Sequence, residues 1–194
     1  MLPSAGLRRC SPTIAEPGTP GDIDIVLYRR WILIALALCG CHAELDWREV
    51  APKEADFSVL LPARAHEASR PLAGFKGDPV MHLWSAKAAD TLFGAGYADF
   101  DAADARVLAL MRDALVRNIG GKIVTERAVK TDMTEGVEFV AEGSIGDARA
   151  VLHGRVLMAG RRVYQLAVIG PVHSVSTADR EMFLESFRLR TPAR

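Results

Sequence analysis

ARAVLHGRVLM (148–158), AGR (159–161) and RVYQLAVI (162–169) follow one another near the end of the chain. The two longer segments are rich in side chains that favour strands, and the glycine in the short connection is typical of a hairpin turn. The segment before them, GVEFVAEG (136–143), alternates: Val137, Phe139 and Ala141 share one face, while Glu138 and Glu142 share the other. Strands joined by short turns pair antiparallel, so this region predicts an antiparallel sheet with one buried face.

The same criteria predict further strands, at residues 57–62, 80–86, 91–100, 123–130 and 187–189. A first helix is expected from a cap within Asp101–Asp104 to about Asn118, where Gly120-Gly121 ends it. A second is expected from about Thr177 to Ser186, with Ser176 or Thr177 as its cap. This order predicts the α+β class, a largely antiparallel sheet flanked by two main helices.

The composition excludes several classes of function. The chain has 194 residues with 24 basic and 24 acidic side chains, so the basic footprint of a nucleic-acid-binding protein is absent and no nucleic-acid partner is expected. Its three cysteines are Cys10, Cys39 and Cys41. The residues after Cys41 therefore cannot form a disulfide framework or a thiolate zinc site, and we expect neither a metal nor a cofactor.

The N-terminal region has the parts of a secretory signal. Tyr28-Arg29-Arg30 supplies positive charge, Trp31 to Leu38 is an unbroken apolar run, and Cys39-Gly40-Cys41 closes it. A spanning helix needs about 20 apolar residues, which favours a cleaved signal over the alternative of a single-pass protein with an uncleaved N-terminal helix. A start at Val26 would give a compact signal, so we suspect that translation begins there.

Leu38-Cys39-Gly40-Cys41 resembles the lipobox of bacterial lipoproteins, with Cys39 as a departure at a position where Ala, Ser or Thr is commoner. The resemblance implies cleavage after Gly40 and lipidation of Cys41 with diacylglycerol and a fatty acid such as palmitate. It also implies a membrane-anchored protein that faces the periplasm of the cell envelope, and His42 after the cysteine favours the outer membrane. The expected organisation is therefore a disordered leader plus signal peptide (1–40), a lipid-anchored tether (41–55) and a single α+β domain (56–191).

The order of the segments in the body is similar to that of PsbP-like domains, which are α/β/α sandwiches. The strand at 57–62, the segment 162–168 followed by Gly170-Pro171, and residues 183–187 carry this resemblance. It covers roughly residues 46–190. Members of that fold mostly bind proteins or assist assemblies, so the resemblance implies a binding role without catalysis.

No motif in the body assigns a catalytic residue. His82 is expected to be partly buried and hydrogen-bonded, and His153, with Arg149 and Arg155, is expected on a solvated face. His173, Ser174 and Asp179 lack the turn of a hydrolase nucleophile, and helix capping explains Ser176 and Asp179 better. The aromatic side chains of residues 84–100 and Trp47 are expected in the core, although they could line an apolar pocket.

Three functions are compatible with these features. A non-enzymatic interaction or assembly module of the envelope, contacting other envelope proteins, is favoured by the anchor and by the PsbP-like order. A binding protein for a small apolar ligand or lipid, using residues 80–100 and the first helix, is the alternative. A hydrolase built around His173 or His82 is the third.

Overall fold

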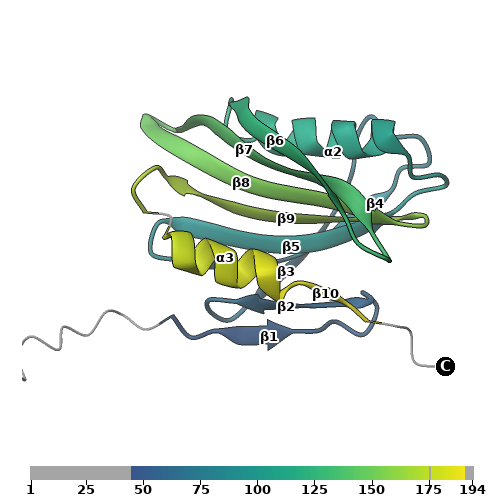
Figure 1. Ribbon diagram of the computed structural model, residues 1–194, viewed down its shortest axis with the longest axis horizontal. Coiled ribbons are helices and arrows are strands. Elements are labelled where there is room, and N and C mark those ends of the chain that lie inside the picture. Colours follow the sequence, from purple (N-terminus) through teal and green to yellow (C-terminus); the bar gives the residue numbers. More distant parts are fainter. Residues whose placement is uncertain (1–44, 175, 191–194) are drawn as a thin grey trace, which may run out of the picture. The chain divides into compact units, whose positions relative to one another are not determined.

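A seven-stranded antiparallel sheet with the order β3-β4-β5-β9-β8-β7-β6 is the largest element of the fold (Figure 1). The computed structural model describes residues 45–174 and 176–190. In sheet order the strands are β3 (His66–Pro71), β4 (Val80–Ala88), β5 (Thr91–Asp99), β9 (Arg162–Pro171), β8 (Ala148–Ala159), β7 (Glu135–Ile145) and β6 (Lys122–Lys130). A small sheet has the order β1 (Arg48–Val50), β2 (Phe57–Leu61) and β10 (Arg188–Leu189). The helices are α2 (Ala105–Arg117) and α3 (Thr177–Ser186).

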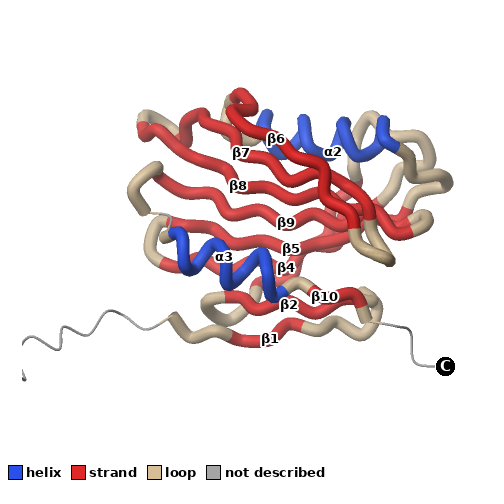
Figure 2. Tube along the Cα trace, viewed as in Figure 1, coloured by secondary structure: helices blue, strands red, loops and turns tan. Residues whose placement is uncertain are grey.

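The predicted hairpin of residues 148–169 is confirmed. β8 and β9 pair antiparallel, with Leu157 opposite Tyr164 and His153 opposite Val168. Gly160 in the turn has φ +60°, which a glycine adopts without strain. The α+β class, the antiparallel sheet and both helices are likewise as predicted (Figure 2).

Helix α2 covers one face of the large sheet. Its buried residues Leu108, Met111 and Leu115 join a core with sheet residues that include Phe139, Leu152 and Val163. The helix begins at Asp104, whose carboxylate accepts a hydrogen bond of 2.9 Å from the backbone N–H of Val107. It ends before Gly120, which has φ +54°.

The other face of the large sheet is packed against the small sheet and α3. Phe57 of β2 lies in its core and meets Trp84, Tyr164 and Phe187, with ring centroids 5.5–6.1 Å apart. Ser176 caps α3 by accepting from the backbone N–H of Asp179. The large sheet therefore has a buried core on each face, so the described part of the chain forms three layers.

Two strands, β1 and β3, were not predicted. β1 pairs with β2, and Trp47 beside it meets Phe93 edge to face at 6.1 Å between ring centroids. The predicted tether at 41–55 is therefore wrong for residues 45–55, which belong to the folded unit. β3 is exposed along its whole length, so its side chains show no apolar alternation.

Several predictions concern the N-terminal region. The leader, the signal peptide, the suspected start at Val26, cleavage at Gly40 and lipidation at Cys41 all lie outside the described residues. Within the described ranges, neither helix is long and apolar enough to cross a membrane.

Candidate functional site

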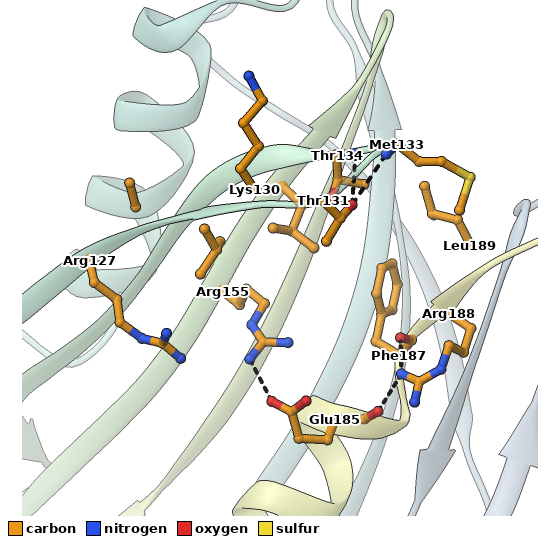
Figure 3. A pocket seen from close by; sticks show the side chains of 13 residues that line it. Arg127, Lys130, Thr131, Met133, Thr134, Arg155, Glu185, Phe187, Arg188 and Leu189 are labelled. Atoms are coloured by element: carbon orange, nitrogen blue, oxygen red, sulfur yellow. Dashed lines mark hydrogen bonds and ion pairs between the residues drawn. The ribbon is translucent and has the colours of Figure 1, made fainter.

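A cleft of about 570 Å³ opens between the large sheet and the end of α3 (Figure 3). One wall comes from β6 and β8, the opposite wall comes from residues 185–189, and the β6–β7 turn closes one end. The cleft is lined by Arg127, Ala128, Val129, Lys130, Thr131, Met133, Thr134, Arg155, Leu157, Glu185, Phe187, Arg188 and Leu189. Its size falls within the range of about 300–1,000 Å³ that is common for small-molecule sites.

The cleft has an apolar lining that continues the core of this face. Leu157 and Phe187 are core residues, and Val129 and Leu189 pack against that core. Alternation along β6 and β8 brings Val129 and Leu157 to the same face of the sheet as the two lining arginines. Met133, which is 58% exposed, adds an apolar side chain at the turn.

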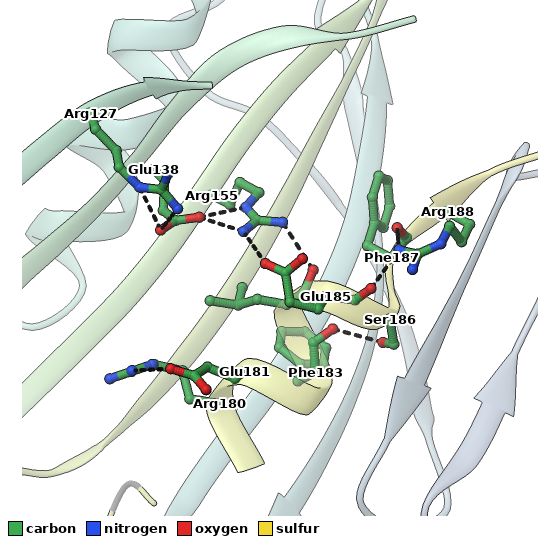
Figure 4. Close-up of polar contacts among 11 residues, drawn as sticks. Arg127, Glu138, Arg155, Arg180, Glu181, Phe183, Glu185, Ser186, Phe187 and Arg188 are labelled. Atoms are coloured by element: carbon green, nitrogen blue, oxygen red, sulfur yellow. Dashed lines mark hydrogen bonds and ion pairs between the residues drawn. The ribbon is translucent and has the colours of Figure 1, made fainter. Parts of the chain in front are cut away.

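Glu138 holds two of the lining arginines in place (Figure 4). It accepts hydrogen bonds of 3.0 and 2.7 Å from Nε and Nη2 of Arg127, and one of 2.8 Å from Nε of Arg155. Burial on its own would raise the pKa of the Glu138 carboxyl, but hydrogen bonds from the two guanidinium groups outweigh it and lower the pKa. Glu138 therefore remains a carboxylate throughout the neutral pH range.

Arg155 joins the sheet to α3. In addition to its bonds to Glu138, it donates to the backbone oxygen of Leu184 at 3.0 Å and to Oε1 of Glu185 at 3.1 Å. Only 14% of its side chain is exposed. This chain of contacts, the Glu138–Arg155–Glu185 bridge, forms the end of the cleft opposite the β6–β7 turn.

The β6–β7 turn is held by its own threonines. Thr131 and Thr134 exchange backbone and side-chain bonds: Thr131 N–H donates to the Thr134 carbonyl at 2.8 Å, and Thr134 N–H donates to Thr131 Oγ1 at 3.0 Å. The Met133 N–H also donates to Thr131 Oγ1, at 3.3 Å. The turn that carries Met133 is therefore preorganised at the mouth of the cleft.

Arg188 lies on the wall opposite Arg127. It donates to the backbone oxygens of Glu185 and Phe187 at the C-terminal end of α3. Within the described ranges no carboxylate lies within ion-pair distance of its guanidinium group, whereas Arg127 has one such partner and Arg155 has two. Among the described residues, the contacts that hold the Arg188 guanidinium group are therefore those to backbone oxygens.

A second hollow of about 360 Å³ lies on the other side of the Glu138–Arg155–Glu185 bridge and contains His153 and Arg180 among its lining residues. The expectation of a solvated face is wrong for His153 and Arg155, because α3 lies over them, and correct for Arg149, whose side chain is 80% exposed. Burial lowers the pKa of His153, the nearby Arg180 lowers it further, and Glu138 opposes the shift. His153 is therefore neutral at pH 7.

The structure also shows where the remaining candidate residues His82, His173 and Ser174 lie. His82 is half-buried, as predicted: its Nδ1 lies 2.9 Å from Ser69 Oγ, and its ring stacks on Tyr97. Ser174 bonds to Thr91 and to the carbonyl of Pro171, and His173 is exposed, so they form no hydrolase triad. No group of three potential metal ligands occurs within the part of the chain that the structure covers.

The aromatic residues of segment 84–100 lie in the core, as predicted from the sequence. Trp84, Phe93 and Tyr97 belong to the core under the small sheet, and Phe100 belongs to the core under α2. The cleft lies elsewhere, among residues that the sequence did not single out for binding. Their signal was weak, because arginine and glutamate in alternation on a strand are typical of a solvated face, and only the position of α3 turns that face into a cleft.

Comparison with known proteins does not assign the chain to a family. No protein-family model matches the chain, and no curated protein matches its sequence. Among solved structures it is similar to a crystal structure from Bacteroides thetaiotaomicron VPI-5482, with a TM-score of 0.40 and 14% identity. The match covers 73% of this chain and 47% of that chain, so this chain spans less than half the length of the similar protein.

Proposed function

We propose that this protein is a non-enzymatic binding module that is anchored to the membrane through a lipid on Cys41 and faces the periplasm, more specifically at the outer membrane. The lipobox-like segment Leu38-Cys39-Gly40-Cys41 supports the anchor. The order of the segments in the sequence resembles that of PsbP-like domains, whose members mostly bind proteins or assist assemblies. The proposed partner is another envelope protein, with a small apolar ligand or lipid as the alternative.

The single observation that carries the binding role is the cleft. Its lining combines positively charged side chains with Val129, Leu157 and Phe187, and both its ends are held by hydrogen bonds. A preorganised hollow with apolar walls and a few fixed polar groups is what a binding site needs, because little conformational freedom is lost on binding.

The experiment is site-specific photo-crosslinking in living cells, with a photoreactive amino acid in place of Met133 at the mouth of the cleft. Leu110, which is 41% exposed on α2 over the opposite face of the sheet, is the matched control position. We expect a discrete adduct from position 133 that is absent from position 110. Mass spectrometry of the adduct distinguishes an envelope protein from a small ligand.

The same cells test the anchor. Metabolic labelling with palmitate should label the wild-type chain, and Cys41→Ala should abolish the label. An unlabelled wild-type chain would contradict the anchor and favour the uncleaved helix. Equal adducts from positions 133 and 110 would contradict the binding role.

A further inference from the structure

We propose that the cleft binds an amphipathic monoanion, a small molecule with one negatively charged head group and an aliphatic chain. The inference rests on the proposed function, since it names the ligand class of the same cleft. The aliphatic chain, the charge and the size of the ligand each follow from residues that line the cleft.

The apolar part of the ligand follows from the inner wall. Val129 of β6, Leu157 of β8 and Phe187, which joins α3 to β10, meet along this wall. Leu157 is only 6% exposed and Phe187 only 9%, so they form a floor that is continuous with the core. Such a floor gains free energy by covering its remaining exposed area with an aliphatic chain.

The charge of the ligand follows from the cations. Arg127, Lys130, Arg155 and Arg188 line the cleft. The carboxylates that contact them are those of Glu138, Glu185 and Glu135. Four cations against three carboxylates leave one positive charge, and Arg188 is the cation without a carboxylate partner among the described residues. One negative charge on the ligand would balance it.

The size of the ligand follows from the two ends of the cleft. Arg155 and Glu185 of the Glu138–Arg155–Glu185 bridge form one end, and the Thr131–Thr134 turn forms the other, as Figure 3 shows. Both are tied by hydrogen bonds of 2.8–3.1 Å. A volume of about 570 Å³ between fixed ends accommodates one aliphatic chain of moderate length. We place the head group at Arg188 and the chain over Phe187, Leu157 and Val129.

The test uses calorimetric titration of the chain from residue 41 onward, with Cys41→Ser so that no acyl group competes for the cleft. The probes share a twelve-carbon chain: dodecanoate, dodecyltrimethylammonium and lauroyl-lysophosphatidylglycerol, each below its micellar concentration. We expect dodecanoate to bind with a Kd on the order of 100 μM. Dodecyltrimethylammonium should bind at least about tenfold more weakly, because its head group meets Arg188 with like charge.

Comparison of the two anions separates the possible sources of the ligand. Tighter binding of dodecanoate indicates a free fatty acid, whereas tighter binding of the lysophospholipid indicates a membrane lipid with a phosphodiester head group. Either order supports the inference, because both probes are amphipathic monoanions.

Three variants locate the binding. Arg188→Gln should weaken dodecanoate about 5- to 20-fold, and Arg188→Lys should restore most of the loss. Val129→Phe, which keeps strand propensity but fills the floor, should weaken every probe at least about tenfold. Arg149→Gln removes an exposed arginine that does not line the cleft, and should change binding less than about twofold.

Equal affinity for dodecanoate and dodecyltrimethylammonium would overturn the inference, as would binding that survives Val129→Phe in a chain whose thermal melt is unchanged. Absence of binding by all three probes would also overturn it. A position-133 adduct in cells would then still support the binding module, so the two proposals can fail separately.

Discussion

Glu138 is the side chain on which the polar end of the cleft depends, because it orients Arg127 and Arg155 together. A carboxyl with a lowered folded-state pKa stabilises the fold above its unfolded pKa, and this contribution is lost as the pH falls through the folded value. We expect Glu138→Gln to lower the free energy of unfolding by about 1–3 kcal/mol at pH 7, since the bonds of a poorly exposed Arg155 are weakened. The difference from wild type should shrink as the pH falls below 4.5, the ordinary value for this carboxyl.

Urea denaturation of both proteins between pH 7 and pH 3.5 measures this difference. Glu142→Gln is the control, because Glu142 lies on the same strand and pairs with the exposed Arg149 at 3.4 Å. It should stay within about 0.5 kcal/mol of wild type at every pH. A Glu138→Gln deficit that is as large at pH 3.5 as at pH 7 would contradict the charged interaction.

The roles of some single residues could be predicted from the sequence, and those of others could not. Asp104 and Ser176 were recognisable as helix caps because a cap depends on neighbours three residues away. Arg155 was assigned to a solvated face because its partner Glu185 lies 30 residues further along the chain. No local pattern reveals such a contact, and the cleft depends on it.

At the scale of elements, helix α2 allows the contribution of its predicted N-cap to protein stability to be measured. Asp104→Ala removes the acceptor of the 2.9 Å bond from Val107 N–H, and should destabilise the protein by about 1 kcal/mol. Asp101→Ala is the control, because Asp101 precedes the cap and is 76% exposed beside Arg161. Thermal unfolding should show a clear decrease in Tm for Asp104→Ala alone, and equal decreases in both variants would argue against the cap.

One physical reason explains why neither β1 nor β3 was predicted from the sequence. β1 has three residues, and all six residues of β3 are exposed, so neither strand has the apolar alternation on which prediction relies. They form because β2 and β4 supply their backbone partners. The longer strands β7, β8 and β9 each bury a face, and their alternation or apolar content was sufficient to find them.

At the scale of the whole molecule, the start of the folded unit decides how closely the proposed anchor holds it. Under that proposal, six residues lie between Cys41 and β1 at Arg48, and the seven residue steps of an extended chain span at most about 25 Å. A tether up to residue 55, as the sequence predicted, would have allowed about twice that reach. Under the proposed anchor, the position of β1 therefore about halves the reach of the chain between Cys41 and the folded unit.

Two truncations test this boundary. A chain beginning at Leu45 retains β1 and the contact of Trp47 with Phe93, so its Tm should equal that of the chain from residue 41. A chain beginning at Asp56 loses both, together with Ala55, which is fully buried, and should lose at least about 2 kcal/mol of stability. Because β1 pairs with β2, the loss should appear in the cooperative unfolding transition. Equal Tm values for the two truncations would show that β1 is peripheral and that the effective tether extends to residue 55.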